Sequence, residues 1–288
     1  MSKSGSFFLY VCLLAVMVVF WPSLTQAQTQ QASCTFHTFG LSASPQMISV
    51  SGVNDYGTVV GEADFGPNAS PRFRAFIHYS GGATNYWVPS GVKGSAFGGR
   101  NDAGLTTGAY TDSSNKTHAF IRKGSTLIPV VRPYGAGVGG INRYNTVVGT
   151  YFDSNGNAHG FKRYSDGNVI HLSYPGAQAT RAYALNDSGV IVGFYNVKYG
   201  PERGFIYKNN QWATLQFPNA PLSTELYGVS NSNVIVGQGQ AHAYLYKNGT
   251  SKEISVPASA ETQVRAIAPG GLIAGMADLT HGFLASCH

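Results

Sequence analysis

The chain has 288 residues, of which only 11% are charged and 36 are glycine, with a formal net charge of +6. Average proteins contain roughly 25% charged residues, and this glycine-rich, charge-poor composition favours short strands and tight turns over helices. Lysine and arginine are scattered without a basic run, which excludes a dedicated nucleic-acid-binding protein. The positive charge is compatible with a weak attraction to an acidic surface or polysaccharide.

The N-terminus has the pattern of a secretory signal. Lys3 precedes an apolar run from Phe7 to Trp21, and Thr25-Gln26-Ala27 places small residues at the two recognition positions of a cleavage site. We predict a signal peptide over residues 1–27 and a single mature domain over 28–288, located outside the cell or in a periplasm. The alternative is an uncleaved anchor. No later stretch approaches the length of a membrane-spanning segment, so we expect none in the mature chain.

A ten-residue motif, Gly-x-Asn-Asp-x-Gly-x-Val-Val-Gly in its fullest form, occurs six times. Its closing glycines are 38 to 47 residues apart, a period that matches the blade of a β-propeller. The sixth position is always Gly or Asn, the residues that best accept a positive φ in a hairpin turn. The copies are Gly52–Gly61, Gly99–Gly108, Gly140–Gly149, Ala184–Gly193, Gly228–Gly237 and Ala266–Gly275.

Each copy precedes a second signature, a His or Arg followed by a small residue and an aromatic. A fourth strand, often ending in proline, is expected next at Tyr86–Pro89, Ile128–Pro133, Ile170–Pro175, Leu215–Pro218 and Ile254–Pro257. The sixth repeat stops after its third strand, and Thr35–Gly40 precedes the first repeat. We therefore predict an all-β, six-bladed propeller of four-stranded blades, closed by the N-terminal strand, which completes the last blade.

The repeated motif followed by His-Ala-Phe or His-Gly-Phe resembles the bacterial extracellular repeat family named HAF after that tripeptide. The resemblance covers almost all of residues 28–288, although Arg74 and Arg203 replace the histidine, and Ser230 and Ala268 replace the asparagine. It implies secretion and a repeat architecture. It implies no activity.

Cys34 and Cys287 are predicted to form a disulfide, whereas Cys12 belongs to the signal. The end of the third strand meets the start of the fourth in an antiparallel pair, so a bridge there would replace the missing hairpin loop. An alternative is a lipid on Cys34, because Gln31-Ala32-Ser33-Cys34 half resembles a lipoprotein cleavage box.

The first residues of the second signature are equivalent positions and form a candidate ligand-binding ring. We favour a structural role for them, in which each bonds a neighbouring strand, and we expect no metal, because ligands one per blade lie too far apart to share an ion. No cofactor is expected. The six are Arg74, His118, His159, Arg203, His242 and His281.

Carboxylates are scarce in the mature chain. Asp153-Ser-Asn155-Gly-Asn157 half resembles a calcium loop, but it lacks the later glutamate and is better explained as a hairpin turn. Glu62, Asp64, Glu202 and Asp278 remain as candidates in the loops between second and third strands. There is no Gly-x-Ser-x-Gly elbow.

Two functions follow. We favour a monomeric, non-enzymatic binding or adhesion module for an extracellular polysaccharide or a surface protein, because its long loops gather on one face of the propeller. The alternative is an extracellular hydrolase or lyase acting on sugars or lactones. It requires several of these carboxylates to meet a histidine at the central channel.

Overall fold

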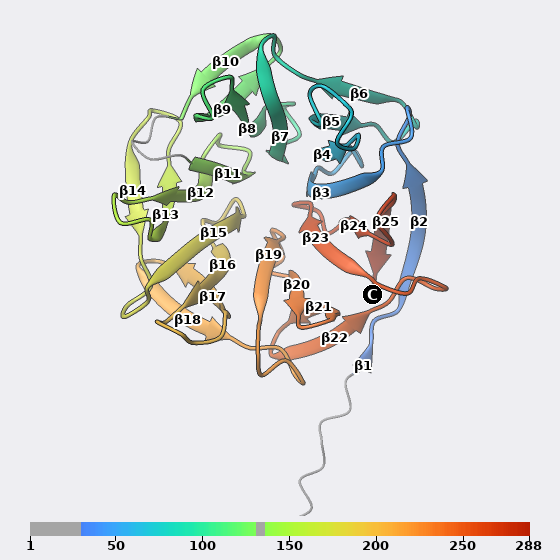
Figure 1. The fold of residues 1–288 in the computed structure, drawn as a ribbon. Coiled ribbons are helices and arrows are strands. Elements are labelled where there is room, and N and C mark those ends of the chain that lie inside the picture. The colour runs from blue at the N-terminus through green and yellow to red at the C-terminus, as the bar shows by residue number, and fades with distance from the viewer. Residues whose placement is uncertain (1–29, 131–135) are drawn as a thin grey trace, which may run out of the picture.

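The computed structural model of the chain describes residues 30–130 and 136–288 and shows an all-β, propeller-like ring of sheets (Figure 1). The predicted signal peptide, with Cys12, lies outside the described residues. No described residue belongs to a helix, so the described residues contain no helix that could cross a membrane. Successive strands pair antiparallel from the centre of the ring to its edge.

The strands fall into four positions, named here from the channel outwards. The inner strands are β3 (Met47–Val53), β7 (Val92–Arg100), β11 (Ala136–Ile141), β15 (Ala179–Leu185), β19 (Glu225–Val229) and β23 (Gln263–Ile267). The second strands are β4 (Val59–Asp64), β8 (Thr106–Asp112), β12 (Val147–Phe152), β16 (Ile191–Asn196), β20 (Ile235–Gly239) and β24 (Ile273–Met276). The third strands are β5 (Phe73–His78), β9 (Thr117–Lys123), β13 (Ala158–Arg163), β17 (Arg203–Lys208), β21 (His242–Lys247) and β25 (His281–Cys287). The outer strands are β6 (Thr84–Trp87), β10 (Thr126–Pro129), β14 (Val169–Leu172), β18 (Gln211–Leu215), β22 (Thr250–Ile254) and β2 (Cys34–Gly40).

Hydrogen bonding divides the described strands into five sheets. Four are blades, β11–β14, β15–β18, β19–β22 and β23–β25 with β2, and the third of these gains the short parallel strand β1 (Gln30–Gln31). The fifth is a curled sheet of eight strands, β3 to β10, in which a single parallel bridge, Phe73 to Gly94, joins β5 to β7. The prediction of separate four-stranded blades therefore does not describe this part of the hydrogen bonding. The early start of β7, at Val92, brings it beside β5.

The outer strands begin earlier than predicted. β6, for example, covers Thr84–Trp87 instead of Tyr86–Pro89, and Pro89 follows the strand. The turn before it places Gly82 at a φ of 88°, so the chain has already reversed there and the strand starts two residues before its expected position. Proline has no backbone N–H to donate to a β-ladder, and Pro89 accordingly lies beyond the paired segment. Pro133, in the second predicted strand, lies outside the described residues.

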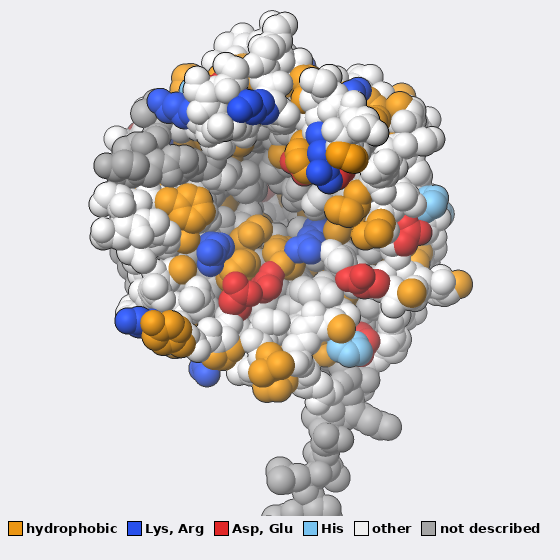
Figure 2. Space-filling model, in the orientation of Figure 1, with side chains coloured by type: hydrophobic (Ala, Val, Ile, Leu, Met, Phe, Trp, Pro, Cys, Tyr) orange, Lys and Arg blue, Asp and Glu red, His pale blue; other side chains and the backbone are white. Residues whose placement is uncertain are grey.

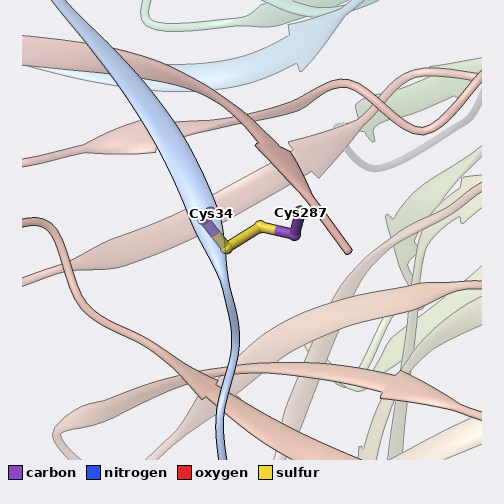
Figure 3. The surroundings of a disulfide bond; sticks show 2 residues. All are labelled: Cys34 and Cys287. Atoms are coloured by element: carbon purple, nitrogen blue, oxygen red, sulfur yellow. A yellow bond between two sulfur atoms is a disulfide. The ribbon is translucent and has the colours of Figure 1, made fainter.

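β2 pairs antiparallel with β25 over its whole length, from Cys34 opposite Cys287 to Gly40 opposite His281. Figure 1 shows β2 along the outer edge of the ring, where the two ends of the described chain lie side by side. The predicted disulfide is confirmed: Cys34 and Cys287 are bonded, with their Cα atoms 4.1 Å apart (Figure 3). A lipid on the Cys34 sulfur is incompatible with this bond.

The two sequence signatures meet inside each blade. The motif's closing glycine lies opposite the signature's aromatic residue, as Gly61 does opposite Phe76. A Cβ on Gly61 would collide with the carbonyl oxygen of Ser49 and come within 2.9 Å of the Phe76 ring. The six aromatics are at most 2% exposed, and each belongs to a different buried hydrophobic cluster; they are Phe76, Phe120, Phe161, Phe205, Tyr244 and Phe283.

The motif asparagine has a role beyond its own turn. The Oδ1 atom of Asn186 accepts from the N–H of Val190, as a turn-forming asparagine should, at 3.0 Å. Its Nδ2 also donates to the carbonyl of Ser230 in the next blade, at 2.9 Å. Asn101 and Asn142 make the same pair of bonds toward the blades that follow them. These buried amides therefore link neighbouring blades around the ring.

Candidate functional site

The predicted His/Arg ring lies at the start of the third strands, where its four histidines meet carboxylates of their own repeats. His118 is 2.7 Å from the Asp112 carboxylate, and His242 is 2.6 Å from that of Glu253. His159 and His281 meet Asp153 and Asp278 in the same way, at 3.2 and 3.0 Å. This geometry favours the structural role.

The two arginines of the ring differ from its histidines. Arg74 donates to the carbonyl of Pro71 at 3.2 Å and covers the Phe65 ring, 4.2 Å from its centroid. Arg203 begins β17 opposite Tyr195. Neither residue is among those that line the central cavity described below. A ligand role for the ring stays a prediction.

The calcium-like segment forms a tight turn around one carboxylate. Asp153 accepts hydrogen bonds from the N–H groups of Asn155 and Asn157 at 2.8 and 2.9 Å, and from the Asn157 amide at 3.0 Å. These bonds and the one to His159 hold the pKa of Asp153 well below its usual range. Within residues 30–130 and 136–288, no group of three or more His, Cys, Asp or Glu side chains is placed to hold a metal ion.

The other candidate carboxylates do not gather at one site, although Glu62 and Asp64 lie close to each other on β4. Asp64 forms an ion pair with Arg72 at 2.6 Å, which lowers the pKa of Asp64. Asp278 accepts from the backbone of Thr280 and His281. Glu62 is held by β4, where burial raises its pKa. Glu202 hydrogen-bonds the carboxyl group of Glu225, a residue that was not a candidate from the sequence.

Bulges in the inner strands shape the channel. Each inner strand shifts its register against the second strand just before its motif copy, so that an extra residue is inserted there. The residues at these points come immediately before the six motif copies, and they are Ser51, Gly98, Gly139, Tyr183, Tyr227 and Arg265. Three consecutive inner strands, β3, β7 and β11, thus contribute small residues, and β15, β19 and β23 contribute large ones.

This asymmetry leaves a cavity of about 390 Å³ in the channel, lined by all six bulge residues. Ser49, Ala96 and Gly137, two residues earlier on β3, β7 and β11, extend its open side. Toward the turns between inner and second strands, the free space narrows to about 50 Å³. Figure 2 shows the wide end: a central hollow, with acidic and basic side chains beside it over β15, β19 and β23.

Six side chains form what we call the mouth cluster: Arg181 and Tyr183 on β15, Glu225 and Tyr227 on β19, Arg265 on β23, and Glu202 from the loop between β16 and β17. A backbone bond from Thr224 N–H to Glu202 O, at 2.9 Å, fixes that loop beside β19. Tyr183 is 36% exposed and packs edge-on against Tyr227, whose ring is 5.2 Å away and only 8% exposed. Tyr183 also stacks on Phe194, with ring centroids 5.3 Å apart, and it is one of the residues that line the cavity.

The two carboxyl groups of the cluster share a hydrogen bond, and the Tyr227 hydroxyl donates to Glu225. Burial and the neighbouring Glu202 raise the pKa of Glu225 to about 7, although Arg265 and Arg181 oppose the shift. Like charges in contact cannot both ionise cheaply, so near neutral pH the pair holds a single proton for part of the time.

The arginines are positioned by aromatic rings. The Arg265 guanidinium lies 4.5 Å from the Tyr227 ring centroid and donates to Gln263 at 2.7 Å. Its Nε is buried without a hydrogen-bond partner among the described residues, and burial lowers the pKa of Arg265. Arg181 lies 5.5 Å from the Phe194 ring centroid.

Sequence reasoning found one member of this cluster, Glu202. A usable signal was nevertheless present: the residue before each motif copy varies from serine and glycine to tyrosine and arginine, while the motif keeps Gly or Asn at its sixth position and Gly at its tenth. Residues that vary within a strict repeat are those the repeat architecture does not require. Whether the side chains of these residues point into the channel depends on the bulges, which the sequence alone does not reveal.

No family model matches the chain, and no curated protein does. Solved propeller structures do match. A catalytically inactive virginiamycin B lyase from Staphylococcus aureus, bound to quinupristin, has a TM-score of 0.53 at 11% identity, covering 88% of this chain and 99% of that one. The Aleuria aurantia lectin with α-methyl-L-fucoside has a TM-score of 0.50 at 11% identity, covering 87% and 96%. A gluconolactonase from Xanthomonas campestris has a TM-score of 0.50 at 8% identity, covering 90% and 92%. These likenesses show the fold alone.

Proposed function

We propose that residues 28–288 are one secreted domain, a six-bladed propeller of the HAF type. The eight-stranded sheet contains two motif copies and two sets of four strands joined by one bridge, which supports counting it as two blades. β2, paired with β25 and bonded through Cys34, is then the fourth strand that closes the last blade. The disulfide fits an oxidising compartment outside the cytoplasm.

The function we propose for this domain is binding of a saccharide at the channel mouth. The observation that carries it is an open cavity of about 390 Å³ with tyrosine and paired charged groups along one side. Cavities of this size accommodate small ligands, and a few converging polar groups on an apolar wall orient them. The exposed part of the Tyr183 ring would contact the apolar face of a sugar, while carboxylate and guanidinium groups bond its hydroxyls.

A panel of soluble glycans, measured by calorimetry against residues 28–288, tests this function. The Tyr183→Ala variant should lose about tenfold in affinity, because a lost ring contact costs about 1.4 kcal/mol. Tyr144→Ala is the matched control: Tyr144 is 53% exposed, but it lies in the turn between β11 and β12, at the other end of the channel. Equal losses in the two variants, or no binding by any glycan, would remove the proposal. A surface protein that binds the domain while every glycan fails would replace it.

A second candidate is hydrolysis or elimination of a sugar or lactone. The hydrogen-bonded Glu202–Glu225 pair favours it, because a general acid works best with a pKa near the working pH, and that of Glu225 is about 7. No described contact brings a histidine to this pair, and Glu62 and Asp278 lie elsewhere. Turnover of a bound glycan or a lactone, lost in Glu225→Gln while binding persists, would establish this activity in place of simple binding.

A further inference from the structure

From the charges around the cavity, we infer that the channel mouth accepts uncharged saccharides and excludes those carrying carboxylate or sulfate groups. This inference rests on the proposed saccharide binding and assigns the class of ligand to the same site. It runs against the composition of the chain, whose net charge of +6 would by itself favour acidic polysaccharides.

Acidic groups outnumber basic groups at the mouth. Beside the 390 Å³ cavity lies a second one of about 220 Å³, which shares Ser49 and Arg265 with it and is also lined by Glu261 and Asp278. Together with Glu202 and Glu225 of the mouth cluster, these make four carboxyl groups, against the two guanidinium groups of Arg181 and Arg265. The lining residues of β3, β7 and β11 carry no charge. Even with one proton on the glutamate pair, the acidic charge exceeds the basic charge by one.

The arginine nearest both cavities is already engaged. Arg265 has one face over Tyr227 and donates through Nη2 to Gln263, whose own amide donates to Glu261 at 2.5 Å. The Nε that lacks a partner is buried, so a ligand cannot reach it without displacing the side chain. An incoming carboxylate therefore cannot form the side-on bidentate pair through Nε and Nη2 of Arg265.

The second arginine is also balanced by a carboxylate. Arg181, two residues before Tyr183 on β15, lies close enough to Glu225 to lower its pKa. Its guanidinium covers Phe194 and is the remaining positive group of the cluster. A sugar hydroxyl can accept a hydrogen bond from a guanidinium group of the mouth cluster or donate one to a carboxylate. An anion would be attracted by a guanidinium group but repelled by several carboxylates.

The glutamate pair makes the exclusion depend on pH. Titratable and charged groups face Glu225 from several elements: Arg181 and Tyr183 from β15, Tyr227 from β19, Arg265 from β23, and Glu202 from the loop between β16 and β17. Gln238, which pairs with Glu225 from β20, is uncharged. Glu225 releases its proton as the pH rises through about 7. The mouth then becomes more negative, so discrimination against anions should increase from pH 6 to pH 8.

Glycans supplied in matched pairs test the inference. Oligogalacturonate and its methyl ester have the same backbone and differ in charge, and a wider panel of sulfated and desulfated pairs serves the same purpose. Affinities are measured at pH 6 and pH 8. We expect the uncharged member of each bound pair to bind at least tenfold more tightly, with a larger ratio at pH 8. In Glu202→Gln/Glu225→Gln the ratio should fall toward one, through a gain of affinity for the charged member.

Asp166→Asn is the matched control, because Asp166 lies in the turn between β13 and β14 and bonds only Asn168 among the described hydrogen bonds. It should leave the ratio unchanged. A melting curve shows whether the double variant is folded, and Glu202→Gln alone replaces it if it is not. Charged members that bind as tightly as their uncharged partners would overturn the inference and leave the proposed function standing. Failure of every pair would overturn the proposed function itself.

Discussion

Removing the amide of Asn186 should show how strongly the repeated motif holds the ring together. In Asn186→Ala four hydrogen bonds disappear: two donated, to Ser230 O and Asn233 Oδ1, and two accepted, from Val190 N–H and the Ser188 hydroxyl. Asn186 is only 2% exposed, and the Ser230 carbonyl and the Val190 amide lie in the same buried layer. Each buried group left without a partner costs about 1–3 kcal/mol, so we expect a loss of about 3 kcal/mol in the free energy of unfolding.

Urea denaturation followed by tyrosine and tryptophan fluorescence measures this loss. Asn231→Ala is the matched control, because Asn231 also joins two blades, through Asp187 at 2.6 and 3.0 Å, but lies at the exposed surface where water replaces its bonds. It should cost less than about 1 kcal/mol. A loss for Asn186→Ala no larger than that of the control would refute the view that buried amides hold neighbouring blades together.

Three further predictions concern the mouth, the closure and the turns. Folding raises the pKa of Glu225 from 4.5 to about 7, so its contribution to stability is complete below pH 4.5 and is lost as the pH rises through 7. The melting temperature should therefore fall from pH 5 to pH 8, and it should fall less in Glu225→Gln. Cys34→Ser/Cys287→Ser should lower the free energy of unfolding by at most about 5 kcal/mol, which is the chain-entropy limit for a sequence separation of 253. If chemical denaturation shows a loss near zero, strand pairing alone holds the ends. Gly57 has a φ of 70°, so Gly57→Val should lower the free energy of unfolding by more than about 1 kcal/mol, and Gly57→Asn by far less. Equal melting temperatures of the two variants would contradict the alignment of the repeats.

Much of the fold was predictable because its determinants are local. All six turn positions have a positive φ, from Gly57 to Gly271, as the choice of glycine or asparagine indicated. The buried aromatic of the second signature, such as Phe283, and the meeting of Cys34 with Cys287 follow from a period and a strand count. The outer strands were misplaced by a few residues, because proline marks where a ladder has ended and the preceding turn glycine marks where it begins.

What the sequence determined by itself is therefore the repeat: its turns, its glycine–aromatic contacts and the bridge between its ends, all set by backbone conformation and short-range pattern. Only the tertiary structure decided the candidate site. A bulge turns Tyr183, Tyr227 and Arg265 into the channel, and Glu202 meets Glu225 only because adjacent blades bring a loop beside a strand. A bulge depends on how one strand fits its neighbour, and contacts between blades depend on the closure of the whole ring, so neither is encoded in the spacing of residues along the chain.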